Sequence, residues 1–225
     1  MHSCIAPYLL PEEHPMKGTL DLIFSQSRAL ENIDALQAAG FTIIAGPMPF
    51  SYVIVARHPA VTGYVFKLYL DSEMRQRKQI PHWVWLVRRC SGARLLKELI
   101  QRKGLHLFAV PDKWLYLLPE YPASSGSNPQ LVVLMETDMQ PESCEITEKM
   151  WKQAVTREHL EELYVILKQG YGGHGLVSLT ANIPFTKQGI FAITDTEDPQ
   201  ADLKLPYIKR FLSPEMQEYW DTLTN

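Results

Sequence analysis

Two residues whose side-chain oxygens could hold a metal ion, Asn182 and Asp195, flank a short apolar segment. Residues 183–186 and 190–194 are apolar runs separated by Lys187-Gln188-Gly189, a pattern that predicts a β-hairpin. A hairpin brings Asn182 and Asp195, thirteen positions apart, to one open end. An amide and a carboxylate oxygen suit a hard cation such as Mg²⁺. Asn and Asp are also common turn and capping residues, so that interpretation stays open.

A lone lysine, Lys67, lies in the apolar stretch Tyr64-Val-Phe-Lys67-Leu-Tyr. It follows Val53, the end of Gly46-Pro-Met-Pro-Phe50-Ser51-Tyr-Val53, by fourteen residues. On physical grounds, a lone lysine inside a strand is more often a solvent-facing residue on a half-buried sheet.

The order of these residues resembles the protein-kinase family. The gap between Asn182 and Asp195 is similar to that between the catalytic-loop Asn and the Asp of Asp-Phe-Gly, so both would bind metal. The stretch from Gly46 resembles the glycine-rich loop, although Met48 and Ser51 replace two glycines. Lys67 resembles the lysine of strand three, which contacts the α- and β-phosphates. The resemblance implies ATP with Mg²⁺ as the ligand.

The resemblance also assigns roles to two acidic residues. Glu98 would pair with Lys67, since it is the only carboxylate in the predicted helix 91–102, although it could equally be an ordinary surface residue. Glu136 follows the apolar strand 131–135 and would begin the hinge whose backbone binds adenine, with Met135 limiting the back of that pocket. A methionine in such a strand is also an ordinary core residue.

The sequence departs from the family at the catalytic base. Val177 stands five residues before Asn182, where kinases have aspartate, and valine cannot accept a proton. His174 and Ser178 are the nearby polar residues, and His174 is the candidate substitute base. Only 28 residues follow Glu197, too few for the activation segment and helical half-lobe of kinases.

The elements that must position these residues follow from apolar spacing and turn residues. Residues 1–18 predict an irregular arm, 19–39 one or two helices, and 41–46, 50–57 and 65–70 an antiparallel meander. Residues 80–87 favour a strand or an anchored loop, 105–110 and 113–118 predict strands, and 140–156 a polar connection. A helix is predicted from Leu160 to Leu167, and Ser213-Pro214 predicts the cap of a final helix.

Composition excludes several classes of protein. The 225 residues are 46% hydrophobic and 21% charged, enough for a sizeable core, and the net charge of −3 does not indicate nucleic-acid binding. Three widely separated cysteines favour neither a zinc site nor a disulfide framework. The absence of a membrane span or signal peptide favours a soluble, cytoplasmic protein, with delivery into another cell left open.

These observations predict an α+β fold that is two-lobed and protein-kinase-like. Residues 1–40 would form the arm and helices, 41–136 an antiparallel sheet lobe with one packing helix, and 137–225 a reduced, mainly helical lobe. Three functions compete: a nucleotide-binding pseudokinase acting through contacts with a protein partner, an active divergent phosphotransferase with a non-standard base, and an interaction module without a ligand. A protein partner or substrate is expected in addition to the nucleotide.

Overall fold

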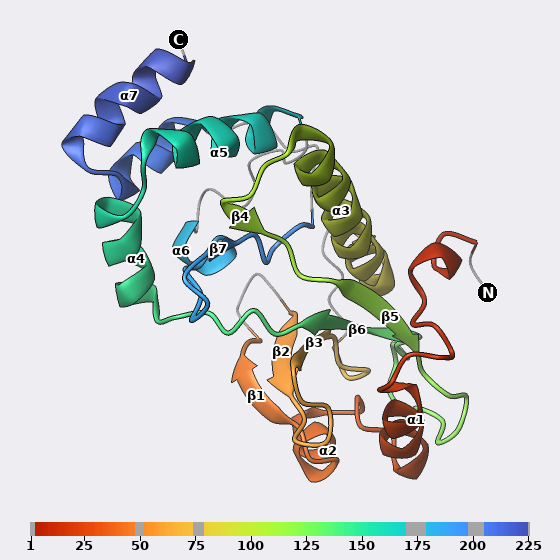
Figure 1. Ribbon diagram of the computed structural model, residues 1–225. Coiled ribbons are helices and arrows are strands. Elements are labelled where there is room, and N and C mark those ends of the chain that lie inside the picture. The colour runs from red at the N-terminus through yellow and green to blue at the C-terminus, as the bar shows by residue number, and fades with distance from the viewer. Residues whose placement is uncertain (1–2, 48–51, 74–78, 170–178, 198–204, 225) are drawn as a thin grey trace. The chain divides into compact units, whose positions relative to one another are not determined.

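A computed structural model describes residues 3–47, 52–73, 79–169, 179–197 and 205–224 (Figure 1). The chain divides into two compact units, which we call the sheet unit and the helical unit. The sheet unit comprises Met1–Cys90 and Lys113–Asp138, and the helical unit comprises Ser91–Asp112 and Met139–Asn225. Residues 1–40, predicted as an arm with helices, fall within the sheet unit.

The sheet unit contains a five-stranded antiparallel sheet in the order β1-β2-β3-β6-β5. This confirms the predicted α+β fold with an antiparallel sheet in the N-terminal region. Its elements are α1 (Lys17–Gln26), α2 (Ile33–Ala38), β1 (Thr42–Ala45), β2 (Ile54–Arg57), β3 (Tyr64–Leu68), the first half of α3 (His82–Lys103), β5 (Lys113–Leu117) and β6 (Val132–Thr137), with a 3₁₀ turn at Ala6–Tyr8. The predicted strands of this region are confirmed, although most are shorter than their apolar runs.

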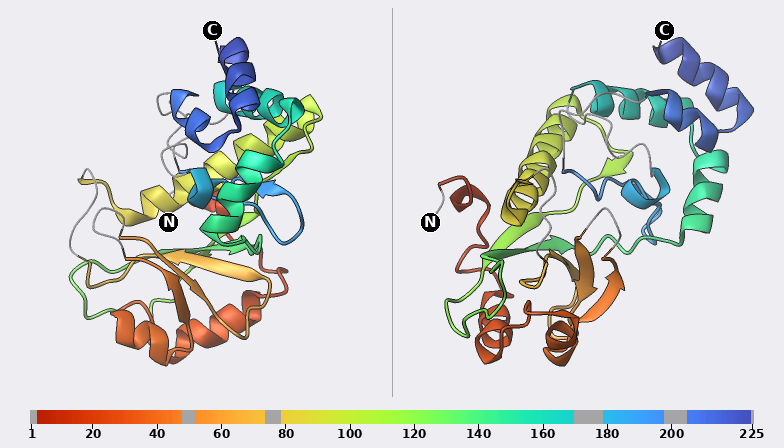
Figure 2. Two further views of the ribbon diagram at one scale, coloured as in Figure 1. Left: turned by 90° about the vertical axis from the view of Figure 1, so that its left-hand side faces the viewer. Right: turned by 180° about the vertical axis from the view of Figure 1, so that it is seen from behind.

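Both faces of this sheet are covered, because alternate residues of each strand point to opposite sides. Helices α1 and α2 cover one face (Figures 1 and 2), where Leu20 and Leu36 pack with Phe66 and Met135. The first half of α3 covers the other face, where Trp85, Leu86 and Cys90 pack with Leu115 and Leu134. Each side chain of β3 and β6 is thus assigned to one of two separate cores.

Helix α3 begins earlier than predicted, so the strand or loop expected at residues 80–87 is wrong. Trp83 and Trp85 favour a strand because aromatic residues have a high β propensity. The buried residues Leu86, Cys90 and Ala93 are instead spaced as in a helix, and they extend the apolar stripe of the predicted helix 91–102 toward its N-terminus. The helical period therefore prevails over the local β propensity of the aromatic residues.

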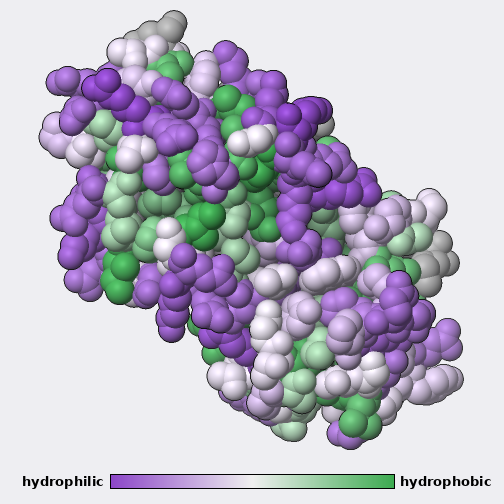
Figure 3. All heavy atoms as spheres, viewed as in Figure 1, coloured by the Kyte–Doolittle hydropathy of each residue, from purple (hydrophilic) through white to green (hydrophobic). Residues whose placement is uncertain are grey.

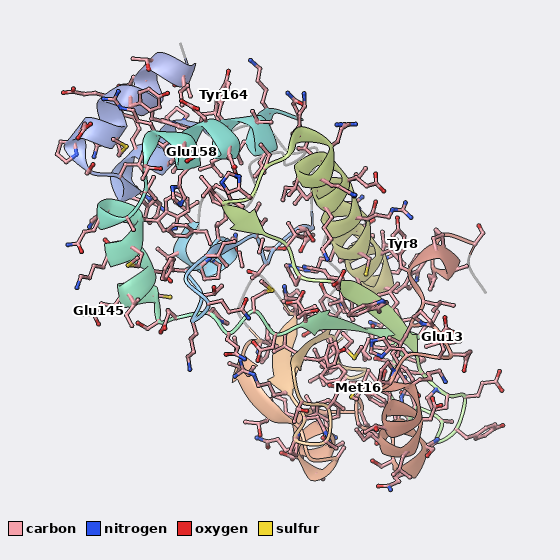
Figure 4. All side chains as sticks on the ribbon, viewed as in Figure 1. Tyr8, Glu13, Met16, Glu145, Glu158 and Tyr164 are labelled. Carbon is pink, nitrogen blue, oxygen red and sulfur yellow. The ribbon has the colours of Figure 1, made fainter. Side chains whose placement is uncertain are left out.

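The helical unit contains the second half of α3 and a small parallel sheet of β4 and β7. Its other elements are β4 (Phe108–Ala109), α4 (Cys144–Gln153), α5 (Arg157–Gln169), α6 (Leu179–Asn182), β7 (Phe191–Ala192), a 3₁₀ segment (Leu205–Phe211) and α7 (Pro214–Thr224). Its core gathers Trp151, Leu163, Phe191 and Trp220. Tyr164, labelled on α5 in Figure 4, lies edge-on to Trp220 of α7 with ring centroids 6.1 Å apart. Figure 3 shows apolar residues gathered over the region of α4, β4 and β7.

Helix α4 is a second departure from the sequence prediction, which treated residues 140–156 as a polar connection. The helix is capped by Ser143, whose Oγ accepts a hydrogen bond from Ile146 N at 3.2 Å. One apolar side chain, Trp151, is fully buried and anchors this otherwise polar helix. The predicted cap of the last helix is confirmed, since Met216 N donates to Ser213 Oγ at 3.3 Å.

Within the described ranges no helix is long and apolar enough to span a bilayer. The three cysteines are free thiols: Cys4 and Cys144 are exposed and Cys90 is buried.

Candidate functional site

The sheet register brings one carboxylate between two lysines in the sheet unit. Glu136 of β6 lies opposite Lys113 of β5 and opposite Val65 of β3, two residues before Lys67. Directly opposed and diagonal residues on one face of a sheet are within side-chain reach. The Lys113 Nζ–Glu136 Oε2 distance is 2.9 Å and the Lys67 Nζ–Glu136 Oε1 distance is 3.1 Å.

This lysine–glutamate–lysine cluster is removed from water. The side chains of Lys113, Glu136 and Lys67 are 0%, 5% and 11% exposed. Burial alone would raise the pKa of Glu136, but the ammonium groups of Lys113 and Lys67 lower it below its usual value. Burial raises the pKa of the Cys90 thiol, on the helix above, to about 12, so the thiol stays protonated and unreactive. Both lysine ammonium groups contact this one carboxylate.

The structure corrects two expectations about the face on which these residues lie. Lys67 is buried, so the solvent-facing interpretation of this lysine is wrong. Met135 packs with Phe66 in the core under α1 and α2, whereas Lys67 and Glu136 alternate to the opposite face. Met135 therefore cannot line one cavity with Lys67, and the cross-strand neighbour of Lys67 on its own face is Leu134.

Within the sheet unit, Lys67 contacts the carboxylate of Glu136, a residue that sequence reasoning placed at the hinge. Glu98 belongs to the helical unit, where its carboxylate lies 3.9 Å from Arg94 Nε, so its pairing with Lys67 stays a prediction. The hinge role of Glu136 concerned its backbone and also stays a prediction. Its neighbour Asp138 already donates its backbone N–H to Gly63 O at 2.9 Å.

Gly46 lies where the predicted phosphate loop begins and has φ +81°. A Cβ at this position would lie 2.2 Å from Val53 O, so no other residue fits this backbone. The glycine is thus explained by close approach of β1 to the start of β2. Met48 and Ser51 lie outside the described residues.

In the helical unit, backbone hydrogen bonds bring Asn182 close to Thr194, the residue before Asp195. Thr194 N donates to Asn182 O at 2.9 Å, and Ala192 N donates to Pro184 O at 3.0 Å. The turn itself is closed by Gly189, which has φ +80° and donates to Thr186 O at 2.9 Å. The backbone of Thr194 thus meets that of Asn182, while the predicted convergence of Asn182 with Asp195 stays a prediction.

The secondary structure of this segment differs from the predicted hairpin. Asn182 ends the short helix α6, and antiparallel pairing is limited to a bridge between Phe185 and Phe191. Strand β7 pairs instead with β4 in parallel. The predicted strands were read from apolar residues, but these residues fill the core of the unit, as Ile183 and Ile193 do.

Asp195 is positioned by contacts on both sides along the chain. Before it, Ile193 N donates to Ala109 O at 2.8 Å, which extends the β4–β7 pairing. After it, Thr196 packs against α3, where a Cβ at Gly92 would lie only 2.0 Å from Thr196 O. Gly92 was missed by sequence reasoning. A single glycine within an amphipathic helix was the available signal.

The remaining predicted residues have no structural test. His174, Val177 and Ser178 lie outside the described residues. Among the described residues no group of three or more His, Cys, Asp or Glu side chains could hold a metal ion. Asn182 with Asp195 still fits Mg²⁺ in type, because Mg²⁺ commonly takes one or two carboxylates and completes its shell with phosphates and waters.

The chain matches no protein-family model, and no curated protein is similar to it.

Proposed function

We propose that this protein binds a nucleotide with Mg²⁺ and acts as a pseudokinase through contacts with a protein partner. The observation that supports the proposal is the 2.9 Å hydrogen bond from Thr194 N to Asn182 O, which links Asn182 to the residue before Asp195. An amide oxygen and a carboxylate held at one end of a turn form a ligand pair suited to Mg²⁺.

Lys67 supports the same proposal. Its ammonium is held on the β3 face covered by α3, 3.1 Å from the carboxylate of Glu136. A buried ammonium group suits a ligand that brings negative charge, because charge-assisted contacts are strong where water is excluded. Phosphate groups supply such charge, and the resemblance assigns Lys67 to phosphates.

The finer fold assignment, a two-lobed kinase-like fold with a reduced helical lobe, belongs to this proposal. The order of elements supports it: β3 with Lys67, then α3, β6, α4 and α5, and finally the turn between Asn182 and Asp195. The sequence favours a pseudoenzyme over a phosphotransferase, because Val177 replaces the expected base.

A second candidate, an interaction module without a ligand, is favoured by one observation. Lys67 already has a carboxylate partner, Glu136, at 3.1 Å. In that case the lysine serves only the stability of the sheet unit.

Thermal unfolding with and without ATP and Mg²⁺ tests the proposal. Ligand at about 100 times its Kd stabilises the folded state by about 2.7 kcal/mol. For a chain of this size that corresponds to a rise in Tm of roughly 5 to 10 °C. We expect Asp195→Ala to lose the part of the rise that requires Mg²⁺, and Lys67→Met to lose most of the rise.

Lys113→Met is the matched control, because Lys113 contacts the same Glu136 carboxylate but lies outside the kinase-like motif. It should keep most of the nucleotide-dependent rise. An equal loss in the Lys67 and Lys113 variants would show that only the charge of the cluster matters. No rise in the wild-type protein would contradict nucleotide binding and favour the interaction module.

A further inference from the structure

The sheet unit contains a cavity of about 850 Å³ that includes none of the residues assigned to nucleotide or Mg²⁺. Its walls include the ends of β5 and β6, part of the loop between these strands, and Arg28, which follows α1. Much of this lining is apolar, with Leu118, Pro119, Pro129 and Leu131 among its residues. Such a size and lining are typical of sites for small, largely apolar molecules.

Two leucines form an apolar wall on one face of the sheet. Leu118 N donates to Leu131 O at 2.9 Å, next to the strand pair of Leu117 with Val132, so Leu118 and Leu131 lie opposite each other. Side chains of opposed residues point to the same face. Leu131 therefore shares the face of Leu118, which belongs to the core under α1 and α2. Leu131 is 44% exposed, so this wall is open to an incoming apolar group.

Arg28 supplies a polar group at the same cavity from a fixed position. Its side chain is 10% exposed, and its Nε and Nη2 donate to Asp71 at 2.7 and 3.0 Å. Nη2 also donates to the backbone oxygen of Gln130, the residue before Leu131, at 2.7 Å. The remaining nitrogen, Nη1, has no hydrogen-bond partner among the described residues and is not one of the fully buried polar atoms. Nη1 is therefore available to donate to a ligand.

The cavity is preformed, because Asp71 anchors both Arg28 and the loop. Asp71 is fully buried, and its Oδ1 accepts a hydrogen bond from Gln130 N at 2.6 Å. Its backbone oxygen accepts one from Asn128 N at 3.2 Å. The loop also packs tightly on this residue, since a Cβ at Gly126 would lie 2.7 Å from Asp71 Cβ. A site that is ordered before binding loses little conformational entropy when a ligand enters.

The charges around Arg28 favour a neutral ligand. The carboxylate of Asp71 already balances the guanidinium through two hydrogen bonds. A carboxylate or phosphate bound at Nη1 would place a second negative charge near that of Asp71, at a site largely shielded from water. The exposed Glu120, which also lines the cavity, adds to this repulsion. A neutral carbonyl oxygen accepts a hydrogen bond from Nη1 without bringing that charge.

We propose that this cavity binds a neutral small molecule with an apolar body and a carbonyl oxygen. The carbonyl oxygen accepts a hydrogen bond from Arg28 Nη1, and the apolar body packs on Leu118 and Leu131. Because the site shares no residue with the proposed nucleotide site, binding requires neither nucleotide nor Mg²⁺.

Octanamide is the probe, added without nucleotide to protein whose leucine methyl groups carry ¹³C, and the methyl signals are followed by NMR. We expect saturable shifts at Leu118 and Leu131 and none at Leu22, which is 60% exposed on α1 and does not line the cavity. Octanoate has the same chain but a charged head, and it should bind at least roughly tenfold more weakly. The absence of saturable shifts at Leu118 and Leu131, or octanoate binding as tightly as octanamide, would overturn the proposal.

Two variants test the two parts of the site in the same titration, followed at Leu118, with circular dichroism to verify folding. Leu131→Ser removes an exposed apolar side chain and should weaken octanamide binding roughly tenfold, whereas the matched control Leu22→Ser should bind as wild type. Arg28→Lys keeps a cation beside Asp71 but lacks Nη1, and it should weaken binding roughly fivefold. Wild-type affinity in Leu131→Ser or in folded Arg28→Lys would contradict the proposed arrangement.

Discussion

The sheet unit and the helical unit each bury a glutamate, and they stabilise its charge by different means. In the sheet unit, Glu136 lies between two lysine ammonium groups on one face of the sheet. In the helical unit, Glu162 of α5 accepts hydrogen bonds from His106 N at 3.0 Å and Leu107 N at 2.9 Å. The first carboxylate is balanced by full charges and the second mainly by backbone dipoles.

The difference depends on whether backbone N–H groups near each carboxylate are already hydrogen-bonded in a strand or helix. A central strand has its backbone groups engaged on both sides, so a carboxylate on β6 can be met only by side chains. The segment after α3 has backbone N–H groups without strand or helix partners, and a carboxylate can satisfy two of them at once. Glu136 therefore holds side chains in place, whereas Glu162 fixes the course of the chain before β4.

The largest expected effect comes from breaking the first arrangement. Glu136→Gln removes the carboxylate charge that both buried lysines contact, and removing one partner of a buried ion pair costs about 3 to 5 kcal/mol. Urea unfolding followed by circular dichroism measures this loss in the free energy of unfolding. A loss below about 1 kcal/mol would show that water reaches the cluster.

Acid should reduce the difference between this variant and the wild type. The lysines hold the Glu136 pKa below its usual 4.5, so its stabilising effect is complete above that pH. It is lost as the pH falls through the folded-state pKa. The unfolding free energies of wild type and Glu136→Gln should therefore converge on acidification.

A smaller effect is expected in the helical unit. Glu162→Ala leaves the N–H groups of His106 and Leu107 without their carboxylate, at a cost of about 2 to 3 kcal/mol. The matched control is Glu158→Ala, on the same helix and labelled in Figure 4. The Glu158 side chain is 63% exposed and lies 3.8 Å from His106 Nε2, so its removal should cost under about 0.5 kcal/mol. Equal losses would mean that the backbone hydrogen bonds of Glu162 contribute little.

The smallest effect should come from removing one lysine of the lysine–glutamate–lysine cluster. Lys113→Met removes one cation and keeps the contact between Lys67 and Glu136. Because methionine fills similar apolar volume and the ion pair is retained, we expect a change of about 1 kcal/mol or less in the free energy of unfolding. A loss as large as that of Glu136→Gln would indicate that Lys113 alone balances the carboxylate.

Features governed by a few neighbouring residues were determined by the sequence itself. The turn closed by Gly189, the cap at Ser213 and the start of the last helix at Pro214 were predicted and are observed. The strands of the sheet unit were found for the same reason, since period-two apolar runs and turn residues act locally. The approach of Asn182 to the residue beside Asp195 also follows from a short turn.

Tertiary structure alone decided which distant residues meet. Lys113 and Glu136 face each other because of the register of β5 against β6, and shifting that register by one residue would move Glu136 to the other face. Because successive side chains of a strand point to opposite faces, Met135, next to Glu136, lies on the face opposite to Lys67. The need for glycine at position 92 arises from the approach of Thr196 to α3, more than a hundred residues later in the chain. Contacts at such sequence separation depend on the packing of whole elements, and local residue patterns do not encode them.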